Sequence, residues 1–188
     1  MSEPEISKAL PITTLILRVF AMLLLLTSVI ILATDSATFK ALLSSQEVTM
    51  RLKYIYSYRY MLSAAVIGIA YTFFQLPFAI YHISTGKRLI KNVAAIYFDF
   101  FSDKVILCFL ASGVGAGFGA TYDLKENLDQ LDDIFKKLGS NLLSEFRTQM
   151  DDFFTMGYVS ATLLLLGFLC FGVSSLLSFL TLFKRAQN

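Results

Sequence analysis

Four long apolar stretches, separated by polar segments, dominate the hydropathy pattern of this chain. Each stretch approaches or exceeds the roughly 20 residues that an α-helix needs to cross the hydrocarbon core of a bilayer. The pattern therefore predicts an all-α fold, a four-helix transmembrane bundle that forms a single membrane domain over residues 10–183. The predicted helices are at about residues 10–33, 60–83, 97–122 and 153–183, with residues 1–9 and 184–188 as short tails.

Small residues recur at four-residue spacing in the second and third stretches. In a soluble helix each glycine costs about 1 kcal/mol relative to alanine, whereas in lipid small residues let neighbouring helices approach closely. The glycines of the third stretch form two pairs on different faces, so we expect this helix to pack on more than one side. The small pairs are Ala64 with Gly68, Gly113 with Gly117, and Gly115 with Gly119.

The segment between the third and fourth stretches is polar and rich in carboxylates, yet it keeps a helical pattern. Leucines and one phenylalanine recur there at alternating steps of four and three residues: Leu124, Leu128, Leu131, Phe135, Leu138 and Leu142. This spacing is typical of an amphipathic helix, and it is interrupted at Gly139. We expect the third and fourth helices to extend beyond the membrane and pack together as an extracellular extension. A dedicated partner-binding helix is the alternative.

The composition agrees with a membrane protein and argues against a soluble or nucleic-acid-binding protein. Hydrophobic residues make up 56% of the chain and the mean hydropathy is +0.65, outside the range of soluble proteins. The net charge is only +2 with scattered basic residues, so nucleic acid is not an expected partner. Both cysteines lie in apolar stretches, which gives no basis for a disulfide framework.

A short basic connector, residues 84–95, joins the second and third stretches. It carries Lys87, Arg88 and Lys91, and short loops with several cations favour the cytoplasmic side. The other loops also contain cations, so charge counts alone leave the orientation open.

Two ionisable residues, Arg18 and Asp103, lie near the start of the first and third stretches. Such a group costs about 2.5–3.5 kcal/mol at the centre of a membrane helix, so it usually faces the bundle interior with a partner. If both helices start at the same face, the two charges lie at similar depth and can form an intramembrane ion pair. Alternatively, Arg18 reaches lipid phosphates and Asp103 the basic connector. Asp103 could also serve a small channel or carrier as its proton or cation site.

No residue pattern in the chain supports an enzyme. The sequence contains no histidine cluster for a metal, no nucleophile with a recognisable base and no phosphate-binding loop. We therefore expect no catalytic residue, no cofactor and no metal ligand.

Three sequence features together resemble the Casparian strip membrane domain protein-like (CASP-like) family, four-span plant proteins related to the MARVEL domain. They are the arginine in LRVFAMLLLL, the aromatic approach RYMLSAAVIGIAYTFFQLP to the second span, and FFSDKVILCFLASGVGAGFGAT in the third. The first feature carries Arg18 and the third carries Asp103. The match extends from Leu17 to about Lys184.

The resemblance implies a non-enzymatic protein of the plasma membrane with both termini in the cytoplasm. It also implies homo- and hetero-oligomers with CASP-like proteins, contact with membrane lipids and recruited cell-wall enzymes as further partners. The best-known members form stable membrane scaffolds that guide local cell-wall modification. Residues 34–59 lack the aromatic, proline-containing motif of those strip-forming members, and the second outer loop has no cysteine. The resemblance therefore points to a CASP-like paralogue.

Overall fold

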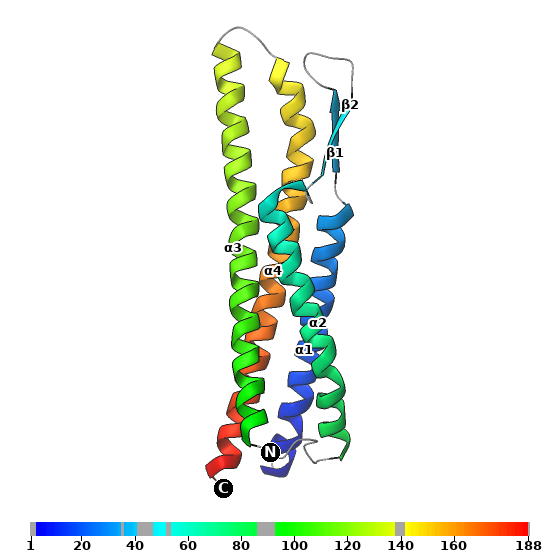
Figure 1. The fold of residues 1–188 in the computed structure, drawn as a ribbon, viewed down its shortest axis with the longest axis vertical. Coiled ribbons are helices and arrows are strands. Elements are labelled where there is room, and N and C mark those ends of the chain that lie inside the picture. The colour runs from blue at the N-terminus through cyan, green and yellow to red at the C-terminus, as the bar shows by residue number, and fades with distance from the viewer. Residues whose placement is uncertain are drawn as a thin grey trace.

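The computed structural model describes residues 3–34, 36–40, 47–51, 54–85, 93–137 and 142–187. Within these residues the protein consists of four long helices and one two-stranded hairpin (Figure 1). The elements are α1 (Glu3–Thr34), β1 (Ser36–Lys40), β2 (Glu47–Arg51), α2 (Tyr56–Thr85), α3 (Val93–Lys137) and α4 (Leu142–Gln187). All four helices are long and apolar enough to cross a membrane, so the predicted four-helix transmembrane bundle is confirmed.

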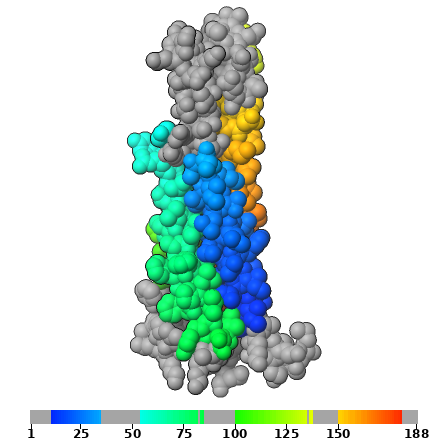
Figure 2. Space-filling model, turned by 90° about the vertical axis from the view of Figure 1, so that its right-hand side faces the viewer, coloured from blue at the N-terminus to red at the C-terminus, as the bar shows by residue number. Residues whose placement is uncertain are grey.

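The helices form a ring in which each one packs against the next in the chain and α4 closes the ring against α1. Figure 2 shows α1 and α2 side by side on one face, with α4 at its edge next to α1. The connections from α2 to α3 and from α3 to α4 are short, and short connections favour antiparallel packing of consecutive helices. Both ends of the chain lie at the same end of the bundle (Figure 1).

Each helix contains the apolar stretch predicted for it and continues beyond it. α1 begins at Glu3, inside the segment expected to be a tail. α3 and α4 continue past their uncharged stretches and pack against each other there, which produces a helical extension. The basic residues of the connector and Gly139 lie outside the described residues.

The buried face of this extension differs in part from the leucine pattern. Leu124 and Leu128 pack against the core, but Leu131 is 47% exposed and Asp132 is buried in its place. Asp132 continues the face of Leu128 by one four-residue step, and it accepts a hydrogen bond from Lys136 Nζ at 2.7 Å. The side chains of Phe135, Leu138 and Leu142 lie outside the described part of the chain.

Residues 34–59, which connect the first two membrane helices in the sequence, contain the β1–β2 hairpin. The strands pair antiparallel, with Ser36 opposite Arg51 and Lys40 opposite Glu47. β1 packs against α4 at the end of the bundle away from the termini (Figure 1). The strands are too short for a period-two pattern to stand out in the sequence.

The bundle is apolar both inside and outside. The hydrophobic core contains one fully buried large apolar residue from each helix: Leu25, Met61, Leu110 and Leu164. The outward faces also carry large exposed apolar side chains, including Ile16, Phe74 and Leu180. Helices that are apolar on all sides suit a bundle surrounded by lipid.

Candidate functional site

Arg18 and Asp103 lie together in the interior of the bundle. Arg18 Nη2 is 3.0 Å from Asp103 Oδ2, and the exposed fractions of the two side chains are only 10% and 6%. Arg18 shares the inward face of α1 with Ala21, one turn away, and Asp103 shares that of α3 with Ile106. A pair of this kind neutralises two charges, either of which would be costly alone in a membrane interior.

Two residues of α2 complete the surroundings of the carboxylate. The Tyr71 hydroxyl donates a hydrogen bond to Asp103 Oδ1 at 2.7 Å, and Gln75 Nε2 donates to the same oxygen at 3.2 Å. Gln75 Nε2 also donates to the Tyr71 hydroxyl, while Gln75 Oε1 accepts from Arg18 Nη1. Tyr71 and Gln75 are one helical turn apart, so they reach the ion pair from the same face of α2.

α4 supplies the remaining partners of the guanidinium. Arg18 Nε donates to Ser174 Oγ at 3.2 Å, and this hydroxyl donates in turn to the carbonyl oxygen of Thr14 at 3.3 Å. The Arg18 guanidinium carbon lies 6.0 Å from the centre of the Phe171 ring, at the limit of a cation–π contact. The ring of Tyr71 meets the same phenylalanine edge-on at 6.0 Å.

All four helices therefore contribute to one buried polar cluster, which we call the polar core. Its members are Arg18, Tyr71, Gln75, Asp103 and Ser174. All three nitrogens of the Arg18 guanidinium and both oxygens of Asp103 have partners within the protein. A buried ion pair is stable only when its remaining donors and acceptors are satisfied. The arrangement can thus fix the depth and rotation of four helices at once.

Three members of the polar core were not singled out from the sequence. Gln75 offered a usable signal, because an amide within an otherwise uncharged span commonly bonds across helices. Tyr71 is one turn before it and so shares its face. Ser174 offered none, since several other serines occupy the spans.

A second polar contact joins α1 directly to α4. Ser28 Oγ donates to the carbonyl oxygen of Ser160 at 2.8 Å, and Ser160 Oγ donates to the carbonyl oxygen of Ser28 at 3.0 Å. Each serine therefore bonds the backbone of the opposite helix, which requires the two backbones to run close together.

The inner glycine pair of α3 allows a close approach to α2. A methyl group at Gly113 would lie 2.9 Å from Ala64 Cβ, and one at Gly117 would lie 2.6 Å from Met61 Sδ. Both distances are shorter than ordinary van der Waals contact. The same helix contact involves Gly68, where a methyl group would lie 3.0 Å from Leu110 Cδ2.

The outer glycine pair faces away from the bundle. A methyl group at Gly115 or Gly119 would meet no described atom within 4 Å, and both residues are exposed. The four glycines therefore divide into two faces of α3, and only Gly113 and Gly117 pack within the protein.

A third polar contact lies at the end of the bundle opposite the termini. The hydroxyl oxygens of Tyr58 on α2 and Thr121 on α3 are 2.6 Å apart. Thr121 Oγ1 donates to the carbonyl oxygen of Gly117, so Tyr58 is the donor to Thr121. Gly157 on α4 leaves the room for this contact, because a methyl group there would lie 2.9 Å from the tyrosine oxygen.

Known proteins similar to this chain come from one plant membrane family. The family model of the Casparian strip membrane protein domain matches residues 7–170. CASP-like protein 4D1 of Ricinus communis is 39% identical over 185 residues, which cover 98% of this chain and 99% of that protein. CASP-like protein 4D2 of Arabidopsis thaliana is 40% identical, with 98% and 96% covered. CASP-like protein 4D1 of Sorghum bicolor is 34% identical, with 95% of each covered. No solved structure matches the chain.

Proposed function

The chain belongs to the Casparian strip membrane protein domain family as a CASP-like paralogue, and from this premise we propose that it is a non-enzymatic scaffold of the plasma membrane. In this proposal it forms oligomers with its own copies and with other CASP-like proteins, and these organise a membrane domain. Both termini face the cytoplasm. Cell-wall enzymes recruited to the domain carry out local wall modification.

The closed polar core is the observation that carries this proposal. Arg18 and Asp103 are buried, and protein groups already occupy each guanidinium nitrogen and carboxylate oxygen. Such a network supports a fixed arrangement of the four helices, and a scaffold requires a stable arrangement of this kind. A carrier that used Asp103 would have to break these contacts to exchange a proton or cation, so the carrier alternative receives less support.

The outer glycine pair supports the assembly part of the proposal. Gly115 and Gly119 leave a strip of α3 without side chains on the lipid-facing side of the bundle. Helices in lipid associate through such surfaces because close backbone approach gains van der Waals contact. A second copy or a CASP-like relative could therefore place a helix against this strip.

The test is fluorescence recovery after photobleaching of a tagged full-length copy in the plasma membrane of a plant cell. A single-span protein of known free mobility serves as the reference. Slow or absent recovery is expected, and recovery as fast as that of the reference would contradict an extended platform.

A variant with Gly115→Leu and Gly119→Leu is expected to recover faster than the unchanged protein, because two bulky side chains would block the strip. Val159→Leu is the control, since Val159 is exposed on a different helix, α4. Equally slow fluorescence recovery of the unchanged protein, the double variant and the control would show that the outer glycines are not part of the assembly surface.

A further inference from the structure

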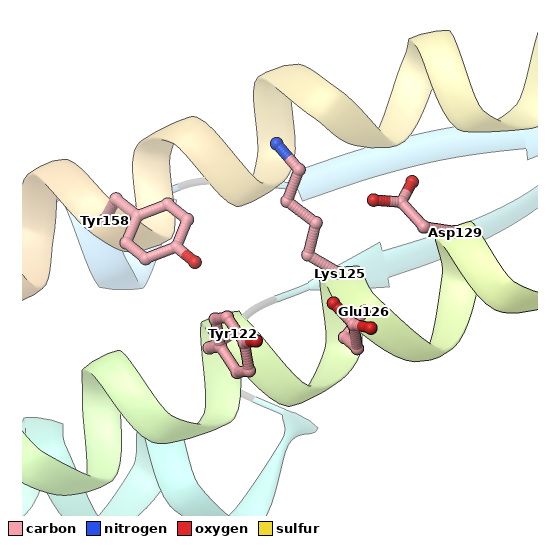
Figure 3. Close-up of a pocket in the computed structure, with 5 residues that line it drawn as sticks. All are labelled: Tyr122, Lys125, Glu126, Asp129 and Tyr158. Atoms are coloured by element: carbon pink, nitrogen blue, oxygen red, sulfur yellow. The ribbon is translucent and has the colours of Figure 1, made fainter.

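A hollow of about 300 Å³ lies between α3 and α4 beyond the Tyr58–Thr121 contact. Tyr122, Lys125, Glu126 and Asp129 line it from α3, and Tyr158 lines it from α4. Figure 3 shows Lys125 and Asp129 extending into the space between the two helices and Tyr158 pointing from α4 towards α3. Tyr122 and Glu126 stand beside them along α3. The sequence alone gave no reason to group these five residues.

The hollow lies at the level where the bundle leaves the hydrocarbon of a membrane. Residues 105–122 of α3 carry no charge, and Tyr122 is the last of them. The contact between Tyr58 and Thr121 brings the tyrosine-rich start of α2 to the same level. Tyrosine is enriched at lipid–water boundaries, because its ring is apolar and its hydroxyl is hydrated. In a bilayer whose boundary lies at Tyr122, phospholipid headgroups would surround the hollow.

The lining presents charges of both signs within one small volume. Lys125 contributes an ammonium group and Glu126 a carboxylate. Asp129, one turn after Glu126 on α3, is a second carboxylate that already has a partner within the protein. Lys125 Nζ lies 3.7 Å from Asp151 Oδ1, and the two side chains are 43% and 51% exposed. An exposed ion pair at that distance contributes little, so the ammonium remains accessible to another anion.

Tyrosine rings complete a site suited to a cation. Tyr122 and Tyr158 stand on opposite helices, and the faces of their rings attract ammonium groups. Glu126 in the lining and Asp151 beside Lys125 place two carboxylates near one ammonium, so a simple anion would be repelled. A simple cation would be repelled by the ammonium group of Lys125. A ligand that joins a phosphate to an ammonium satisfies both parts of the lining.

We propose that this hollow binds the zwitterionic headgroup of a membrane phospholipid. The phosphate contacts Lys125, and the ammonium lies near Glu126 and the two tyrosine rings. Phosphocholine and phosphoethanolamine share this charge pattern. A bound lipid would connect the extension of α3 and α4 to the leaflet at the end of the bundle opposite the termini, whether or not the protein acts as a scaffold.

The experiment uses the full chain purified in a non-ionic detergent. Short-chain phosphatidylcholine, phosphatidylethanolamine and phosphatidylglycerol with identical acyl chains are titrated separately, and bound lipid is counted by native mass spectrometry. At least one zwitterionic lipid is expected to bind about fivefold or more tightly than phosphatidylglycerol, since exposed charge contacts contribute up to about 1 kcal/mol each. A preference for ethanolamine would assign recognition to hydrogen bonds with the Glu126 carboxylate, and a preference for choline to the tyrosine rings.

Variants locate the binding. Lys125→Met should weaken zwitterionic binding by about threefold or more, and Glu126→Gln should also narrow or reverse the preference over phosphatidylglycerol. Asp133→Asn and Lys137→Met make the same charge changes at exposed positions farther along α3 and should leave binding unchanged. Helix content by circular dichroism verifies folding of each variant. Equal or tighter binding of phosphatidylglycerol by the unchanged protein overturns the proposal, as does unaltered binding in both hollow variants.

Discussion

Gly113 on α3 lies directly against Ala64 on α2, so closely that a methyl group at position 113 would be 2.9 Å from the alanine Cβ. The neighbouring contacts of this position are Leu164 on α4 and the backbone of Met61. Neither Ala64 Cβ nor the backbone can rotate away as a long side chain could. The separation of α2 and α3 is therefore set at this point by the absence of a side chain.

Gly113→Ala is expected to lower the free energy of unfolding by about 1–3 kcal/mol, because the added methyl group forces the two helices apart. This loss exceeds the gain of about 1 kcal/mol in helix propensity. Gly119→Ala is the matched control and should be neutral or stabilising, since it meets no described atom. Unfolding in mixed micelles, followed by circular dichroism, measures both. Adding Ala64→Gly should restore part of the loss, and equal stability of the two single variants would contradict the proposed close contact.

Arg18→Asp is expected to abolish stable insertion or surface delivery, because two carboxylates would then face each other in the polar core. Adding Asp103→Arg should restore part of the surface signal of a tagged copy. Restoration should be incomplete, since Gln75 and Tyr71 are placed to donate to a carboxylate on α3. No rescue in the double variant would show that the direct pair is not what the chain requires.

Asp103→Asn separates the structural role from the carrier alternative. Its amide nearly keeps the size of the carboxylate but leaves the buried guanidinium without a counter-charge, which costs about 3 kcal/mol or more. We expect reduced stability in micelles and no change in ion flux across vesicles that contain the protein. A folded variant of normal stability that had lost an ion-dependent flux would instead support a carrier.

Tyr71→Phe is expected to destabilise the bundle by about 1–3 kcal/mol, because it removes the shortest hydrogen bond to Asp103 Oδ1 in a buried site. The control is Tyr60→Phe, which removes a hydroxyl that lies 2.8 Å from Ser112 Oγ on the exposed surface. That loss should stay within about 0.6 kcal/mol, the average for such bonds in a membrane bundle. Thermal unfolding of the two variants in one detergent gives the comparison. Equal losses of stability would show that the hydrogen bond of Tyr71 in the polar core contributes no more than an exposed one.

The four helices could be predicted from the sequence because lipid leaves a spanning segment few alternatives to an apolar helix. Arg18 and Asp103 stood out for a related reason, since an isolated charge in an apolar stretch needs a partner. Ser174 and Tyr71 did not, because uncharged polar residues are common in spans and their partners depend on the rotation of each helix. The rotation also decides that Gly113 faces inward and Gly115 outward.

Two further features lay beyond the sequence pattern. The β1–β2 hairpin has only five residues in each strand, and its position depends on packing against α4. The burial of Asp132 departs from the leucine spacing because the buried face of α3 continues from Leu128 by a step of four residues, not three. Both features depend on how separate segments pack against each other, so one segment alone does not predict them.

The contact between Ser28 and Ser160 has a consequence for how the protein is made. These residues are 132 positions apart, on α1 and α4, so α1 leaves the ribosome well before α4. Arg18 enters the membrane before Gln75, Asp103 and Ser174 have been synthesised, so its partners arrive one helix at a time. Until α3 enters, Arg18 has no counter-charge within the bundle, so we expect α1 to remain beside the insertion machinery, or to be held by a membrane chaperone, at least that long. A nascent chain that stops before α4 exposes an unfinished polar core, which gives cellular quality control a feature by which to recognise it.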